Sequence, residues 1–121
     1  MTQTTTNRDD LRHLAQLTID LDTLEQYYHA ELPGRKPLCI VRNDVVPDEL
    51  ALTKFGEPVR FVSAAEARKP GAACLAFSKI EIQGDAATVE FTYSIEGIRG
   101  TVTFRKASGA WRVESHHVHE R

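Results

Sequence analysis

Three polar side chains in the C-terminal part of this sequence have the chemistry of a small binding or catalytic site. Tyr93 can donate a hydroxyl hydrogen bond to an oxyanion, and His117 can act as a general base because an unperturbed imidazole titrates near neutral pH. Ser115 lies two residues before His117, so the two side chains share one face of a strand. Together these residues indicate a polar site on the inward face of a β-sheet.

Each of these residues also has a structural interpretation. A buried Tyr usually packs in the core, so we favour Tyr93 as a core aromatic that lies over Gly100. We likewise favour His117 as a strand-end residue near solvent, and Tyr28 as the end of an apolar helical stripe. The sequence predicts no catalytic residue, and the ligand-binding residues that it predicts are Tyr28, Tyr93, Ser115 and His117.

The histidine cluster near the C-terminus is a candidate metal site, because neutral imidazole is a common zinc ligand. Of His116, His117 and His119, only the last two share a face of a strand. Zinc needs at least one more ligand and a supporting shell, and no Cys, Asp or Glu can be placed there from the sequence. We therefore favour a solvated polar tail and predict no metal ion and no cofactor.

A meander of four strands is expected to position these residues. Its apolar-alternating segments are 74–83, 86–95, 98–106 and 110–118. Apolar residues at every other position are typical of strands with one buried face. Gly84-Asp85 and Glu96-Gly97 are each typical of a two-residue hairpin loop, in which Gly supplies the positive φ. The pattern therefore predicts an antiparallel sheet with one dry face.

The expected loops also fix the register of the meander. With a loop at Glu96-Gly97, Phe91 pairs with Val102 and Tyr93 pairs with Gly100. A slip of one residue would send half of the apolar set into water, so pattern and turn agree. The small or polar residues that this register gathers around Tyr93 are Cys74, Ala76, Ser78, Gly100, Ser115 and His117. Because interiors are close-packed, they predict a cavity or a side chain that arrives from elsewhere.

The N-terminal half supplies helices and two short strands. Leucines at spacings of three and four between Leu11 and Tyr28 predict two amphipathic helices with a break near Asp20. Apolar runs at 38–41 and 58–62 predict strands, and a loop joins them. Ser63 and Glu66 match the capping box of a short helix. The expected order is therefore α-α-β-β-α-β-β-β-β, with a disordered lead at 1–8 and one domain at 9–121.

Composition limits the classes of partner. The formal charge of −2 and the absence of a Lys/Arg run argue against nucleic acid. No apolar stretch approaches the roughly 20 residues of a membrane helix, and the polar N-terminus has no signal-like apolar region. We therefore expect a cytoplasmic protein. Cys39 and Cys74 lie in apolar runs that predict buried thiols, and a disulfide stays open if their strands are neighbours.

The order of these elements and the closing Gly109-Ala110-Trp111-Arg112-Val113 resemble the NTF2-like (cystatin-like α+β, SnoaL-like) superfamily over residues 9–118. The resemblance implies an α+β fold with N-terminal helices on the concave face of a curved, mainly antiparallel sheet. It implies that ligands enter the cone between helices and sheet. In the superfamily the outer sheet face often forms a two-fold dimer, so the Thr-rich outer face here predicts a homodimer.

Two functions remain open at this point. The inward set of the last three strands holds no carboxylate, which favours a non-enzymatic NTF2-like binding domain that holds a partner protein or a small apolar ligand in or near its cone. The alternative is an isomerase, dehydratase or cyclase that acts on a small apolar substrate through Tyr93, His117 and an acid from Asp44. An open cone with convergent polar groups would favour the enzyme, and a packed interior would favour the binder.

Overall fold

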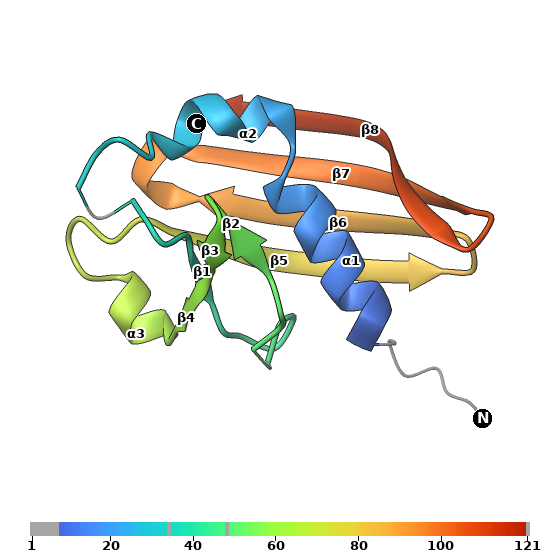
Figure 1. Ribbon diagram of the computed structural model, residues 1–121, viewed down its shortest axis with the longest axis horizontal. Helices are drawn as coiled ribbons and strands as arrows, with labels where there is room; N and C mark the ends of the chain where they lie inside the picture. The colour runs from blue at the N-terminus through green and yellow to red at the C-terminus, as the bar shows by residue number, and fades with distance from the viewer. Residues whose placement is uncertain (1–7, 34, 48, 121) are drawn as a thin grey trace.

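The computed structural model describes residues 8–33, 35–47 and 49–120, and it has an α+β fold (Figure 1). The helices are α1 (Arg8–Ile19), α2 (Asp22–Tyr28), α3 (Ala64–Ala67) and the 3-10 helix η1 (Ser94–Glu96). The strands of the main sheet are β1 (Cys39–Val41), β4 (Arg60–Val62), β5 (Cys74–Gln83), β6 (Ala86–Tyr93), β7 (Ile98–Ala107) and β8 (Ala110–Glu120). The predicted α+β class is therefore confirmed.

The main sheet has six strands in the order β4-β1-β5-β6-β7-β8. β1 pairs in parallel with both β4 and β5, whereas the remaining pairs are antiparallel. The helices α1 and α2 lie across one face of the sheet (Figure 1). A separate hairpin of β2 (Thr53–Lys54) and β3 (Glu57–Pro58) occupies the segment that we predicted as a plain loop. No described helix is long and apolar enough to cross a membrane.

The helical boundaries follow local chemistry. The break near Asp20 is confirmed, since α1 ends at Ile19 and α2 starts at Asp22. The capping box of α3 is also confirmed, because the Ser63 hydroxyl accepts a hydrogen bond from the Glu66 N–H and the Glu66 carboxylate accepts one from the Ser63 N–H. The predicted lead at 1–8 falls outside the described residues except for Arg8, which already belongs to α1.

The first helix is fastened to the last strand by one carboxylate. Asp10 accepts a hydrogen bond from the Trp111 indole N–H at 3.0 Å and forms an ion pair with Lys106 at 3.5 Å. Trp111 is buried there, and the Lys106 ammonium lies 5.4 Å from the centre of its ring. These contacts fix the N-terminal end of α1 to the end of the sheet where β7 turns into β8.

The predicted register of β6 on β7 is wrong by two residues. Phe91 pairs with Gly100 and Val89 with Val102, because η1 lengthens the connection and Gly97 takes a positive φ of 68°. Side chains alternate with a period of two, so an even shift leaves the same residues facing inward. The inward set is therefore right even though its partners are not, and the Phe91 ring lies over Gly100 in place of Tyr93.

A β-bulge in β5 overturns the predicted cavity around Tyr93. The pairs of Ile80 with Val89 and of Ile82 with Ala87 are confirmed, but the register shifts between Phe77 and Lys79. On the N-terminal side of the bulge, Phe77 pairs with Phe91 and Leu75 pairs with Tyr93. Both Leu75 and Phe77 are fully buried. The large side chains fill the space where the predicted register gathered the small residues of β5, which are Cys74, Ala76 and Ser78.

The two cysteines form a disulfide rather than the buried thiols that we predicted. Cys39 of β1 lies directly beside Cys74 of β5, with 4.5 Å between their Cα atoms. The bond packs with Val41 and Val62 in a small apolar cluster that is separate from the main core. It therefore joins the short parallel strands to the antiparallel meander.

Removal of this disulfide should cost a large part of the stability. The two cysteines are 35 residues apart, and the chain-entropy model assigns roughly 4 kcal/mol to a loop of that length. We expect the double variant Cys39→Ala, Cys74→Ala to lose about that free energy of unfolding in urea titrations. A reducing agent should destabilise the parent and leave the double variant unchanged. Equal stability of the oxidised parent and the double variant would contradict this role.

Gly100→Ala should also destabilise the sheet. A Cβ at this position would lie 2.7 Å from Cε1 of the fully packed Phe91 ring, which has no room to move. We expect the free energy of unfolding to fall by about 1–3 kcal/mol, with partial recovery when Phe91→Leu is added. Thr101→Ala, on the other face of the same strand, is the control, and a loss in the control as large as in Gly100→Ala would show that the steric argument fails.

Candidate functional site

A groove lies between α1, the loop after β1 and the second half of β5, and is here named the α1–β5 groove. Its volume is about 660 Å³. Its apolar walls are Leu11, Val45, Val46, Leu50 and Ile80. Its charged residues are Arg8, Asp44, Lys79 and Glu81. A volume of this size falls in the range of sites that bind small molecules or short peptide segments.

The side chain of Asn43 shapes this groove. Its Oδ1 accepts hydrogen bonds from the N–H groups of Val45 and Val46, both at 2.9 Å, which folds the loop into an Asx turn. Its Nδ2 donates to the carbonyl of Phe77 at 2.9 Å, next to the bulge of β5. One amide therefore holds the loop wall of the groove at a fixed distance from the strand wall.

The second half of β5 forms an open edge beside the groove. β1 is only three residues long and pairs with β5 at Cys74 and Leu75 alone. Among the described residues no strand lies on that side of β5 beyond the bulge, as Figure 1 shows along the lower border of the sheet. Alternate backbone N–H and C=O groups of a strand point to each side, so this edge can accept a further strand.

The charges around the groove are of mixed sign. The Arg8 guanidinium donates to the Glu49 carbonyl at 2.8 Å, and Lys79 lies 3.9 Å from Glu81 in an exposed ion pair. Asp44 is exposed in the loop wall. The groove therefore combines apolar walls with charged residues of both signs, which is the chemistry of a binding surface.

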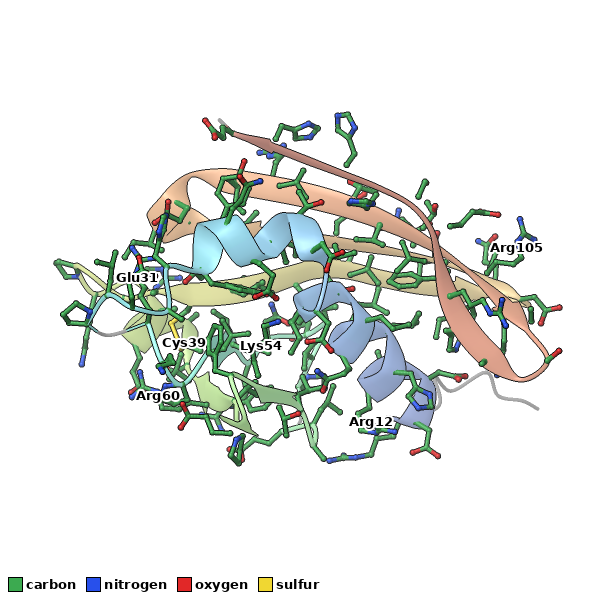
Figure 2. The ribbon with its side chains drawn as sticks, turned by 45° about the horizontal axis from the view of Figure 1, so that its top comes forward. Arg12, Glu31, Cys39, Lys54, Arg60 and Arg105 are labelled. Carbon is green, nitrogen blue, oxygen red and sulfur yellow. A yellow bond between two sulfur atoms is a disulfide. The ribbon has the colours of Figure 1, made fainter. Side chains whose placement is uncertain are left out.

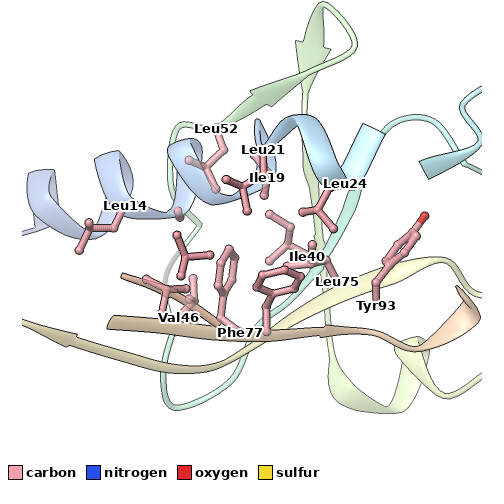
Figure 3. Close-up of a cluster of buried hydrophobic side chains, with 14 of the residues drawn as sticks. Leu14, Ile19, Leu21, Leu24, Ile40, Val46, Leu52, Leu75, Phe77 and Tyr93 are labelled. Atoms are coloured by element: carbon pink, nitrogen blue, oxygen red, sulfur yellow. The ribbon is translucent and has the colours of Figure 1, made fainter. Parts of the chain in front are cut away.

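Of the predicted ligand-binding residues, Tyr28 and Tyr93 lie together, but in the closed core. Their ring centres are 5.7 Å apart at 82°, an edge-to-face contact. The Tyr28 hydroxyl donates to the Ile19 carbonyl at 2.7 Å. Tyr93 lies at one end of the apolar cluster in Figure 3, and its hydroxyl is the one buried side-chain polar atom of the described residues without a hydrogen-bond partner. Both tyrosines are therefore core residues, as the structural interpretation predicted, although Phe91 and not Tyr93 lies over Gly100.

Burial raises the pKa of both tyrosines. For Tyr28 the nearby Glu25 adds to the effect. For Tyr93 the Arg35 guanidinium lowers the pKa in part, since it lies close enough to act on the hydroxyl without the geometry of a hydrogen bond. Arg35 instead donates to the Tyr28 carbonyl and to Glu96, at 3.1 and 3.0 Å. A phenol with a raised pKa stays neutral at physiological pH, so neither residue is prepared to act as a base.

The hairpin of β2 and β3 covers the end of the core at which Tyr28 lies. Lys54 is almost fully buried and forms ion pairs with Asp20 and Glu25, while its ammonium lies 5.3 Å from the centre of the Tyr28 ring. Figure 2 shows Lys54 on the hairpin, in front of the sheet. Phe55 adds an edge-to-face contact with Tyr28 at 5.5 Å. The hairpin therefore seals the place where the resemblance implied an open cone.

Ser115 and His117 lie on the outer face of the sheet, and their predicted inward placement is wrong. A second bulge, opposite Thr103 and Phe104, shifts β8 by one residue. Ser115 consequently bonds the Thr103 hydroxyl at 2.6 Å, and His117 pairs with Thr101. His116 turns toward the helices instead, where it bonds the Thr23 hydroxyl at 2.8 Å.

The three residues of the predicted enzyme site are thus in three separate places. Asp44 lies on the groove, Tyr93 in the core and His117 on the outer face. The groove walls formed by Leu11 and Ile80 were missed, because nothing in the sequence shows that the pairing of β5 with β1 ends at Leu75. The available signal was Asn43-Asp44 after a predicted strand, which is typical of the start of an Asx turn.

Comparisons with family models, with curated proteins and with solved structures find no match for this chain. The function is therefore argued from the geometry of the chain alone.

Loss of the hydroxyl should change the free energy of unfolding differently in the two core tyrosines. Tyr93→Phe removes a buried group without a partner, so we expect the free energy of unfolding to stay equal or rise by up to about 1–2 kcal/mol. Tyr28→Phe breaks the bond to the Ile19 carbonyl and should lower it by about 1 kcal/mol. Urea denaturation of both variants measures the difference, and a clear loss in Tyr93→Phe would indicate a hydrogen-bonded role for its hydroxyl.

Proposed function

We propose that this chain is a non-enzymatic binding domain whose α1–β5 groove holds an extended apolar segment of a partner protein. The observation that carries the proposal is the open edge of β5 along the groove, next to apolar walls. A segment added to such an edge gains main-chain hydrogen bonds, and its alternate side chains enter the adjacent groove. Ile80 and Leu50 would contact these apolar side chains, while Lys79 and Glu81 would contact its polar ones.

The enzymatic alternative has less support. Its acid, phenol and imidazole do not converge, and both tyrosines have raised pKa values in a closed core. A small apolar ligand in the groove is the second candidate, which the volume of about 660 Å³ favours. The open strand edge supports the protein segment over the small ligand, because a small apolar molecule has no use for backbone hydrogen-bonding groups.

Membership of the NTF2-like superfamily remains part of this proposal. It rests on helices that precede and cover a mainly antiparallel sheet and on the final meander. A homodimer through the outer face also remains a prediction. The disulfide is typical of oxidising compartments, which weighs against the expected cytoplasmic location.

The proposal can be tested with a displayed library of random peptides of about ten residues, enough to extend along an average strand. We expect selected peptides to alternate apolar and polar residues and to slow hydrogen exchange of the β5 amides at 79–83. Leu11→Lys places a charge in the groove wall and should weaken binding at least tenfold, or roughly 1.4 kcal/mol.

Leu32→Lys is the matched control, because Leu32 is 43% exposed and does not line the groove. Its affinity for the peptides should equal that of the parent. Peptides that bind Leu11→Lys as well as the parent, or a groove that binds only an apolar dye such as anilinonaphthalene sulfonate, would reject the proposed partner segment.

A further inference from the structure

Two histidines lie side by side on the outer face of β8, at the edge of the sheet. The ring centres of His117 and His119 are 4.5 Å apart, with an angle of 65° between the planes. Both side chains are exposed, and neither forms a hydrogen bond or ion pair with another described residue. These two residues are named here the histidine pair.

The spacing of the histidine pair suits chelation of one metal ion. Zinc binds imidazole nitrogen at about 2.0–2.1 Å, so two nitrogens of a tetrahedral site lie roughly 3.3 Å apart. Rings at 4.5 Å can present nitrogens at that separation by rotation of the side chains alone. The rigid strand fixes both Cα positions, which lowers the entropy lost when the pair closes on an ion.

The pair supplies only half of a tetrahedral site. No group of three or more His, Cys, Asp or Glu side chains with metal-binding geometry occurs in the described part of the chain. The remaining positions must therefore come from outside the described residues. A two-fold axis through the ion would bring the same pair of a second copy, and an edge strand leaves room for that approach.

We propose that His117 and His119 bind Zn²⁺ together with the same two residues of a second copy of this chain, which gives a metal-bridged dimer on the outer face. The proposal does not depend on the α1–β5 groove. It assigns a cause to the predicted homodimer, because the outer face has no exposed large hydrophobic side chain among the described residues: Leu32 and Val113 are the two that are exposed, and neither belongs to this face.

The surroundings of the pair set its affinity. Arg99 is the cross-strand partner of His119, and its positive charge opposes a bound cation. Thr101 faces His117 and is neutral, while Glu90 lies one strand further away, opposite Thr101. A hollow of about 400 Å³ between Arg99, Thr101, His119 and Glu90 leaves space for the side chains of the second copy.

Zinc titration of the full chain tests the proposal. Calorimetry with ZnCl₂ should give one ion per two chains, and light scattering after gel filtration should show a monomer in EDTA and a dimer with Zn²⁺. His117→Ala and His119→Ala should each weaken zinc binding by at least about tenfold and abolish the dimer. Loss of a residue that only supports a metal ligand already lowers affinity about tenfold or more, and loss of the ligand itself should lower it further.

His116→Ala is the matched control, because His116 is an exposed histidine of the same strand that faces the helices. Its zinc affinity should stay within about twofold of the parent. Arg99→Ala should bind zinc at least about twofold more tightly, because it removes the opposing charge. Three results would each overturn the proposal. They are one zinc ion per chain without a dimer, unchanged zinc affinity in His117→Ala, and a higher zinc affinity in the parent than in Arg99→Ala.

Discussion

One extra residue in β5 determines most of the architecture of this protein. The bulge between Phe77 and Lys79 reverses the facing of every residue before it, so Leu75 and Phe77 enter the core and Cys74 turns to the other face. There Cys74 meets Cys39 and forms the disulfide. The pairing of β5 with the short strand β1 ends at Leu75, before the bulge, so the rest of β5 is free to form one wall of the α1–β5 groove. Core and covalent link thus depend on the same local irregularity.

The parts of the fold that the sequence predicted are those set by periodicity and turns. The α+β class, the four meander strands, the break between α1 and α2 and the capping box of α3 all follow from local patterns. The inward set of β6 also follows, because an even shift of register preserves it. The even shift itself arose from η1, a single turn whose residues look like the continuation of a strand.

The positions of the predicted site residues were less predictable, because two odd shifts of register change which way they face. A bulge changes the facing of all residues on one side of it, and neither Ser78 nor Glu114 has a residue type that marks a bulge. Ser115, His117 and the predicted small residues of β5 were therefore placed on the wrong face. The groove walls come from segments far apart in the chain, such as Leu11 and Ile80, and such contacts leave no local pattern.

The bond between Asp10 and Trp111 has a practical consequence for anyone who handles this protein. Trp111 is its one tryptophan, and the indole is held between the first helix and the last strand. The emission of this fluorophore therefore reports on whether the two ends of the polypeptide are in contact. The protein contains its own optical probe for the docking of its N-terminal helix, and no dye has to be attached.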